Sequence, residues 1–238
     1  MKRVKLISLI LVILLLVLFL TVNASVEQQV TTTDPDLACK KVFYNLVAAE
    51  NTQDWDQFCN LFTEDQIKEE KKFFQSSRKV GVKYIKTASL VEIQYLDSKD
   101  SDMNINSNYR NYIVGVDYTV SKEDKYYFNG VNYHLMTLKL ENGTWKILEY
   151  QDAPLENYIP DDKSYINNEG RAEAIVKVMP NLNPKNVKTM LDIIDARTLG
   201  IIINAKGEFL GSNNEDVKSA EDARKLLDQV KSESSIVQ

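Results

Sequence analysis

The residues that could carry acid–base chemistry lie in two alternating runs, 112–120 and 133–140. His134 is the only histidine in the 238 residues, and an isolated His among apolar strand neighbours is more often a packing residue than a catalyst. Asp117 is the other candidate base. It alternates with Tyr118, whose hydroxyl is a candidate donor to an oxyanion. The residue types therefore permit a base and a donor without fixing their geometry.

Two further tyrosines, Tyr112 and Tyr133, are alternative donors on the same strands. A Ser-His-Asp triad can be assembled only through His134, and the sequence has no Gly-rich phosphate loop. We therefore predict no cofactor and lean away from an enzyme.

One polar loop resembles a calcium site. Its alternating oxygen donors are Asp100, Asp102, Asn104 and Asn106, as in an EF-hand loop. Ile105 takes the position that needs Gly, and Asn111 takes the position that needs a bidentate Glu. We therefore predict a polar hairpin loop and no metal, with calcium as the alternative.

The aromatic run Tyr126, Tyr127 and Phe128 precedes the turn dipeptide Asn129-Gly130. Three adjacent aromatic residues can form an exposed binding patch for a protein or a glycan. Packing beneath the sheet explains the same run equally well, so both readings stay open.

The two cysteines, Cys39 and Cys59, fall on the apolar stripes of two predicted helices. Both can be small buried hydrophobic residues. Outside the cytoplasm a disulfide between the helices is the alternative, subject to its restrictive geometry.

These residues must be positioned by helices followed by strands. Apolar residues at helical spacing predict one helix in 35–52, a second in 55–62 and a third in 64–74. Strands are predicted over 90–96, 112–120, 133–140 and 144–150. Asn142-Gly143 between the last two indicates an antiparallel hairpin, because both residues tolerate positive φ.

The helical stretch ENTQDWDQFCNLFTED and the strands ending in NGVNYHLMTLKLENGTWKILEYQDAP resemble the NTF2-like superfamily, a cystatin-like α+β cone. More narrowly, FNGVNYHLMTLKLENGTWKILEYQDAP resembles the accessory domain that precedes peptidoglycan-lytic modules in secreted sporulation-type Gram-positive proteins. The resemblance implies an α+β fold with helices packed on a curved antiparallel sheet, an acid–base site inside the cone in the family's enzymes, and a homodimer paired through the sheets.

Beyond this domain, which we place at residues 34–154, the composition changes. Residues 155–170 read as a linker, and 171–238 as a small, mostly helical unit with a hairpin between 200 and 210. Ser212 with Glu215 suggests a capping box that opens the last helix. A unit of this size has a marginal core, so we expect it to lean on the first domain or on a partner.

Residues 1–24 read as a targeting segment, with a basic start and an apolar run from Leu6 to Val22. We expect cleavage after Ala24, leaving residues 25–33 as a spacer; retention as a transmembrane anchor is the alternative. Both place the rest outside the cytoplasm, secreted or membrane-anchored. Of 29 basic and 34 acidic residues the segment holds three basic ones, so the remainder has a net charge of −8, which argues against a nucleic-acid partner.

Together these observations favour a non-enzymatic extracytoplasmic module at a Gram-positive-type cell envelope that binds an envelope protein or a wall component. The alternative is an NTF2-like small-molecule isomerase or dehydratase with Asp117 or His134 as its base. A hollow interior lined by one of these and a Tyr hydroxyl favours the enzyme, and an interior filled by apolar side chains favours the binding module.

Overall fold

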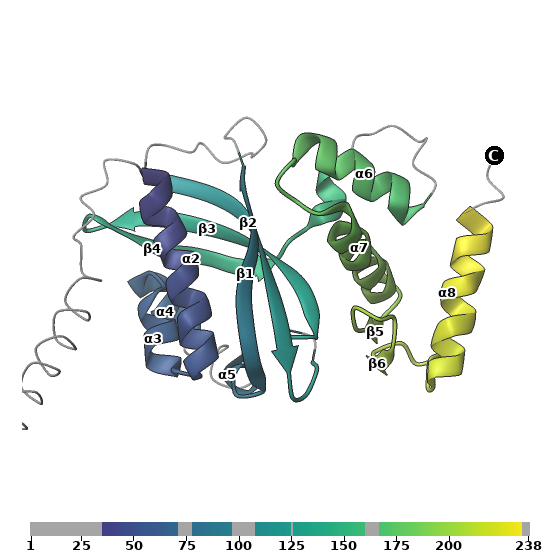
Figure 1. Ribbon diagram of the computed structural model, residues 1–238. Coiled ribbons are helices and arrows are strands. Elements are labelled where there is room, and N and C mark those ends of the chain that lie inside the picture. Colours follow the sequence, from purple (N-terminus) through teal and green to yellow (C-terminus); the bar gives the residue numbers. More distant parts are fainter. Residues whose placement is uncertain (1–34, 71–77, 97–107, 125, 160–166, 235–238) are drawn as a thin grey trace, which may run out of the picture. The chain divides into compact units, whose positions relative to one another are not determined.

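The computed structural model describes residues 35–70, 78–96, 108–124, 126–159 and 167–234. Contacts divide the chain into Met1–Leu37 and Ala38–Gln238, and the account below concerns the second unit. Helices are followed by a four-stranded antiparallel sheet, then by further helices and a two-stranded hairpin (Figure 1). The predicted α+β class is confirmed.

The helices before the sheet are α2 (Pro35–Thr52), α3 (Trp55–Asn60), α4 (Glu64–Glu70) and α5 (Arg78–Val82). The strands β1 (Ile85–Leu96), β2 (Tyr109–Val120), β3 (Gly130–Glu141) and β4 (Thr144–Asp152) pair in chain order. After the sheet come the 3-10 helix η2 (Leu155–Tyr158), α6 (Asn168–Val178), α7 (Pro184–Thr198), β5 (Ile201–Ile203), β6 (Phe209–Ser212) and α8 (Ala220–Ser234).

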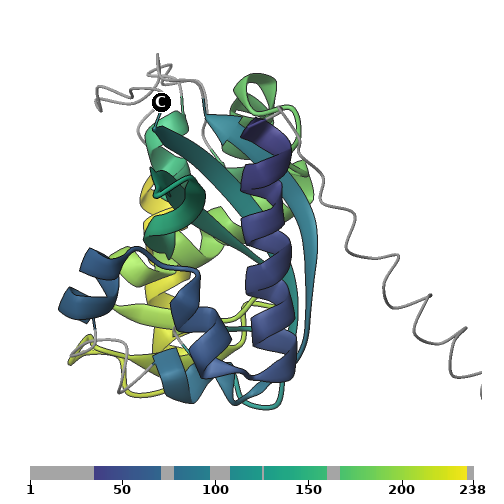
Figure 2. The same ribbon diagram turned by 90° about the vertical axis from the view of Figure 1, so that its left-hand side faces the viewer.

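The apolar stripe of α2 is buried against the sheet, as its spacing predicts. Cys39, Phe43 and Leu46 are completely inaccessible to solvent. Near the end of α2, Asn51 exchanges two hydrogen bonds with the backbone of Ala88 on β1, at 2.7 and 2.9 Å. Figure 2 shows α2 running along the sheet. The helix is therefore fixed to the sheet by apolar packing and by a polar contact at its end.

The β3–β4 hairpin turns where the Asn-Gly dipeptide predicts. Asn142 has φ 51° and Gly143 has φ 78°, the left-handed backbone that this dipeptide tolerates. In the sheet, Val114 lies opposite His134, and Met136 lies opposite Tyr150. This register places all four of these side chains on the face that α2 covers.

The sheet has a hydrophobic cluster on each face. One combines α2 and α3 with sheet residues such as Val116 and Met136. The other combines Ile113 and Tyr133 of the sheet with Leu191 and other residues of the C-terminal elements. The C-terminal unit therefore completes its core on the sheet, as its small size led us to expect.

A carboxylate ties this second face to the start of α7. Glu92 on β1 accepts hydrogen bonds from the Tyr133 hydroxyl, from the Asn183 backbone N–H at 2.8 Å and from the Asn186 amide at 2.7 Å. A Cβ at Gly115 would lie 3.0 Å from the Tyr133 ring, so glycine gives the ring room to cross β2 toward Glu92. Burial, followed by the contact with Glu92, raises the pKa of Tyr133 well above its usual range.

The predicted start of the last helix is wrong. Ser212 belongs to β6, and its hydroxyl donates to the Gly200 carbonyl at 2.9 Å. The helix begins at Ala220, where the Ser219 hydroxyl accepts from the Asp222 N–H at 3.2 Å. A Ser or Thr cap competes with other local hydrogen bonds, and here the hairpin takes the first candidate.

Candidate functional site

A carboxylate lies inside the apolar cluster between α2 and the sheet. Glu50, from the last turns of α2, has no exposed surface. The Tyr118 hydroxyl donates to one of its oxygens at 2.8 Å, and the Tyr127 hydroxyl donates to the other at 3.3 Å. A buried carboxylate needs such donors, because an unsatisfied one is costly in an apolar interior.

Burial raises the pKa of Tyr118 well above its usual value, and the charge of Glu50 raises it further. Tyr150 and Tyr127 contribute in the same direction. The phenol therefore stays protonated at neutral pH and acts as a hydrogen-bond donor, not as a base.

His134 lies beside this carboxylate cluster on β3. It is 1% exposed, and its ring centroid is 4.7 Å from that of Tyr150 and 6.3 Å from that of Tyr118. It shares its face of the sheet with Met136, as the strand parity predicts. Glu50, Tyr118, Tyr127, His134 and Tyr150 form what we call the inner cluster.

Large apolar side chains fill the space around the inner cluster. Phe43, Leu46 and Phe58 are fully buried in the same hydrophobic core, and Trp145 is 8% exposed. Phe58 contacts Phe62 with ring centroids 5.2 Å apart. The groups best suited to acid–base chemistry are therefore enclosed by hydrocarbon.

A pocket of about 500 Å³ lies next to the inner cluster, and the two share Tyr150. We call it the Tyr-Arg pocket. Its lining comes from the β2–β3 connection, the end of β4, the end of α7 and the hairpin: Tyr126, Tyr150, Gln151, Asp152, Arg197, Gly200, Ile201, Ile202 and Asn213. This volume falls in the usual range for small-molecule sites.

An ion pair lies in the wall of the Tyr-Arg pocket. The Arg197 guanidinium, near the end of α7, contacts the Asp152 carboxylate at the end of β4. Their side chains are 26% and 36% exposed, so both remain partly open to solvent. The pair joins the sheet to α7 and leaves the charged lining electrically balanced.

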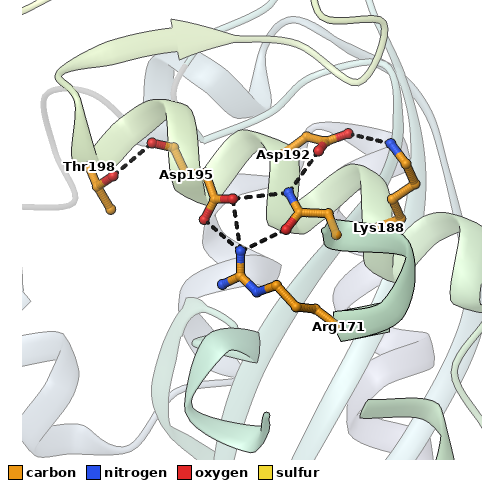
Figure 3. Close-up of polar contacts among 6 residues, drawn as sticks. Arg171, Lys188, Asp192, Asp195 and Thr198 are labelled. Carbon is orange, nitrogen blue, oxygen red and sulfur yellow. Dashed lines mark hydrogen bonds and ion pairs between the residues drawn. The ribbon is translucent and has the colours of Figure 1, made fainter. Parts of the chain in front are cut away.

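A polar network between α6 and α7 holds the helix that carries Arg197 (Figure 3). Arg171 donates to both Asp195 oxygens at 2.9 and 3.1 Å, and Asn168 bridges Asp195 to Asp192. Lys188 pairs with Asp192 at 2.8 Å. Since each of these charges has an opposite partner, the network serves to join the two helices.

The structure separates the candidate base Asp117 from the tyrosines. Asp117 is exposed and lies on the other face of β2 from Tyr118 and Tyr112, while Tyr133 is engaged with Glu92. His134 is the candidate base that the fold brings near Tyr118.

The aromatic run does not form one exposed patch. Tyr127 is 1% exposed and Phe128 is 2% exposed, in opposite hydrophobic clusters, while the half-buried Tyr126 lines the Tyr-Arg pocket. Both cysteines are thiols rather than disulfide partners, with Cys39 buried and Cys59 half-buried.

Two predictions fall on parts of the chain outside the described residues. These are the calcium-like loop with Asp100, Asp102, Asn104 and Asn106, and the targeting segment in 1–24. Within the described ranges, no group of three or more His, Cys, Asp or Glu side chains is placed to hold a metal ion. None of the helices in these ranges is both long and apolar enough to cross a bilayer.

The sequence analysis missed Glu50, Asp152 and Arg197. Glu50 had a signal, because it follows Phe43 and Leu46 at helical spacing and so places a carboxylate on an apolar stripe. Asp152 and Arg197 are 45 residues apart in the chain, and no local pattern joins them.

The comparisons with known proteins assign no family. No protein-family model matches the chain, and no curated protein sequence does. Among solved structures, the chain is similar to Rv3472 of Mycobacterium tuberculosis, a protein whose function is itself unknown. The TM-score is 0.34 at 10% identity, and the match covers 62% of this chain and 98% of the other.

Proposed function

We propose that this protein is a non-enzymatic, extracytoplasmic binding module of the cell envelope, whose partner is an envelope protein or a wall component. The leader-like residues 1–24 support the location. The Tyr-Arg pocket offers a place for a ligand. In the same proposal, residues 34–154 are an NTF2-like accessory domain, and the C-terminal unit supplies part of the pocket wall.

One observation carries this proposal: the acid–base groups are enclosed, while the pocket presents a charge-balanced lining. Glu50 and His134 are 0% and 1% exposed. The pocket lining includes neither of them, and its Arg197 and Asp152 are paired with each other. A general base must come within hydrogen-bond reach of its substrate, so this arrangement favours binding over turnover.

The test is to express the full chain with a C-terminal tag in a Gram-positive host and to fractionate the cells. We expect the protein in the membrane or the culture medium, and retention on purified cell-wall sacculi or on one envelope protein after crosslinking. Asn213→Ala, which changes an exposed pocket residue, should weaken retention, whereas Asn157→Ala on η2 should not. A cytoplasmic protein that neither binds sacculi nor crosslinks to an envelope protein would contradict the proposal.

A second candidate is a small-molecule isomerase or dehydratase of the NTF2-like kind. The observation that favours it is the 4.7 Å separation of the His134 and Tyr150 rings, because Tyr150 also lines the pocket. In that reading His134 is the base, and Asp117, on the other face of β2, takes no part. Turnover that is lost in His134→Gln and kept in Asp117→Asn would establish it.

A further inference from the structure

The Tyr-Arg pocket has features that restrict the chemical class of its ligand. Its walls carry one cation and one anion, Arg197 and Asp152, in contact with each other. A strongly anionic or cationic ligand would have to compete with this pair for one partner and leave the other uncompensated. The electrostatics therefore favour a ligand without net charge.

Two aromatic rings supply the largest lining surfaces. Tyr126 and Tyr150 are both half-buried, and both pack against the core between α2 and the sheet. The Tyr126 backbone N–H also donates to Asp124 at 2.8 Å, which fixes the segment that carries the ring. Rings held in this way offer flat apolar contact at low entropic cost.

The polar part of the lining consists mainly of groups that can both donate and accept hydrogen bonds. Gln151 and Asn213 contribute exposed side-chain amides, each with two N–H donors and a carbonyl acceptor. Neighbouring hydroxyls of a ligand also need both roles. Arg197 and Asp152 add a planar donor and a planar acceptor beside them.

We infer that the Tyr-Arg pocket binds a neutral saccharide, with a sugar ring against Tyr126 and its hydroxyls on the Gln151 and Asn213 amides. The pocket volume of about 500 Å³ accommodates a short segment of a glycan chain. This inference rests on the proposed function: within it, the wall component recognised is the glycan and not the peptide or an anionic polymer.

The binding test uses the full chain in detergent and N,N′-diacetylchitobiose, a neutral disaccharide, as the probe in NMR or calorimetric titration. We expect saturable binding that falls about 5-fold in Asn213→Ala and in Gln151→Ala, the loss expected for one hydrogen bond. Asn157→Ala, an exposed Asn on η2, is the matched control and should bind like the parent. No saturable binding, or equal affinities in all four proteins, would overturn the inference.

Tyr126 provides a second pair of variants. Tyr126→Ala should abolish measurable disaccharide binding, and Tyr126→Phe, which keeps the ring, should retain it within about 5-fold. Thermal unfolding of each variant separates lost binding from lost folding. If Tyr126→Ala remains folded and binds like the parent, the inference is wrong.

Competition on sacculi distinguishes failure of this inference from failure of the proposed function. We expect the disaccharide to displace the protein from sacculi, and inorganic phosphate or the free stem peptide not to do so. Displacement by the stem peptide or by phosphate alone would overturn the saccharide inference and leave envelope binding intact. Absence of binding to both the disaccharide and sacculi would overturn the inference together with its wall-binding basis.

Discussion

The Tyr118 hydroxyl donates a 2.8 Å hydrogen bond to Glu50 at a point where both side chains are buried. The contact joins β2 to the end of α2 across the core. Because removing one partner leaves a buried polar group unsatisfied, the two residues contribute to stability as a pair.

Tyr118→Phe should lower the free energy of unfolding by about 2 kcal/mol, because it removes a hydrogen bond to a charged, buried acceptor. Urea denaturation at neutral pH measures the change. Tyr44→Phe is the matched control: Tyr44 is 60% exposed on α2, and we expect its stability to equal that of the parent. Equal stability of the two variants would contradict the role we give to Tyr118.

Glu92→Ala should free the start of α7 from the sheet, because Glu92 accepts hydrogen bonds from Tyr133, Asn183 and Asn186. We expect a loss of about 2 kcal/mol in the free energy of unfolding. The amides in the first turn of α7 should also exchange faster with solvent. Glu173→Ala, at an exposed carboxylate on α6, should change neither quantity, and unchanged exchange in Glu92→Ala would count against the tether.

The elements that could be predicted from the sequence are those whose signals are local. The α2 stripe needs only residues three and four apart, and the turn at Asn142-Gly143 needs only two adjacent residues. The fold class follows from the order of such signals. The boundary of α8 was missed because Ser212 had a competing hydrogen bond to Gly200, 12 residues away.

The candidate site depends on contacts that no local pattern encodes. The two hydroxyls on Glu50 come from residues 68 and 77 positions away. The aromatic run at Tyr126 diverges because Tyr127 enters one core and Phe128 enters the other. His134 and its face could be assigned from strand alternation, but its closeness to Tyr150 depends on the β3–β4 register, which a shift between Thr137 and Leu138 alters.

A double-mutant cycle on Arg171 and Asp195 should give a coupling free energy of about 1 kcal/mol, because Arg171 contacts both carboxylate oxygens and its side chain is 22% exposed. The control cycle uses Lys225 and Glu221 on α8, whose side chains are 68% and 69% exposed. We expect a coupling of about 0.3 kcal/mol there. Equal couplings would mean that the network in Figure 3 stabilises the helix pair no more than a surface pair does.

Acid should remove a contribution of Glu123 to stability. Burial acts to raise the pKa of Glu123, but hydrogen bonds from Asn204 and Asn129 outweigh it and lower the pKa from its ordinary value of 4.5. A lowered pKa in the folded state gives stability that is present above this ordinary value and is lost as the pH falls through the lowered one.

The thermal midpoint of Glu123→Gln should therefore lie below that of the parent at about pH 7, and the gap should close by about pH 3. Glu156→Gln, at an exposed position on η2, is the control and should show no pH-dependent gap. A gap for Glu123→Gln that stays constant across this range would show that the contribution does not depend on ionisation.

Gly200 and Gly207 separate backbone strain from close contact beside the Tyr-Arg pocket. Their φ angles are +74° and +76°, so alanine at either position should cost about 1 kcal/mol in left-handed strain. A Cβ at Gly200 would also lie 3.1 Å from the Asn214 Cβ, whereas at Gly207 nothing lies within 4 Å. We therefore expect Gly200→Ala to lower the free energy of unfolding by about 2 kcal/mol, roughly twice the loss in Gly207→Ala. Urea denaturation compares them, with Gly211→Ala as the control that has neither effect, and equal losses at positions 200 and 207 would rule out the contact with Asn214.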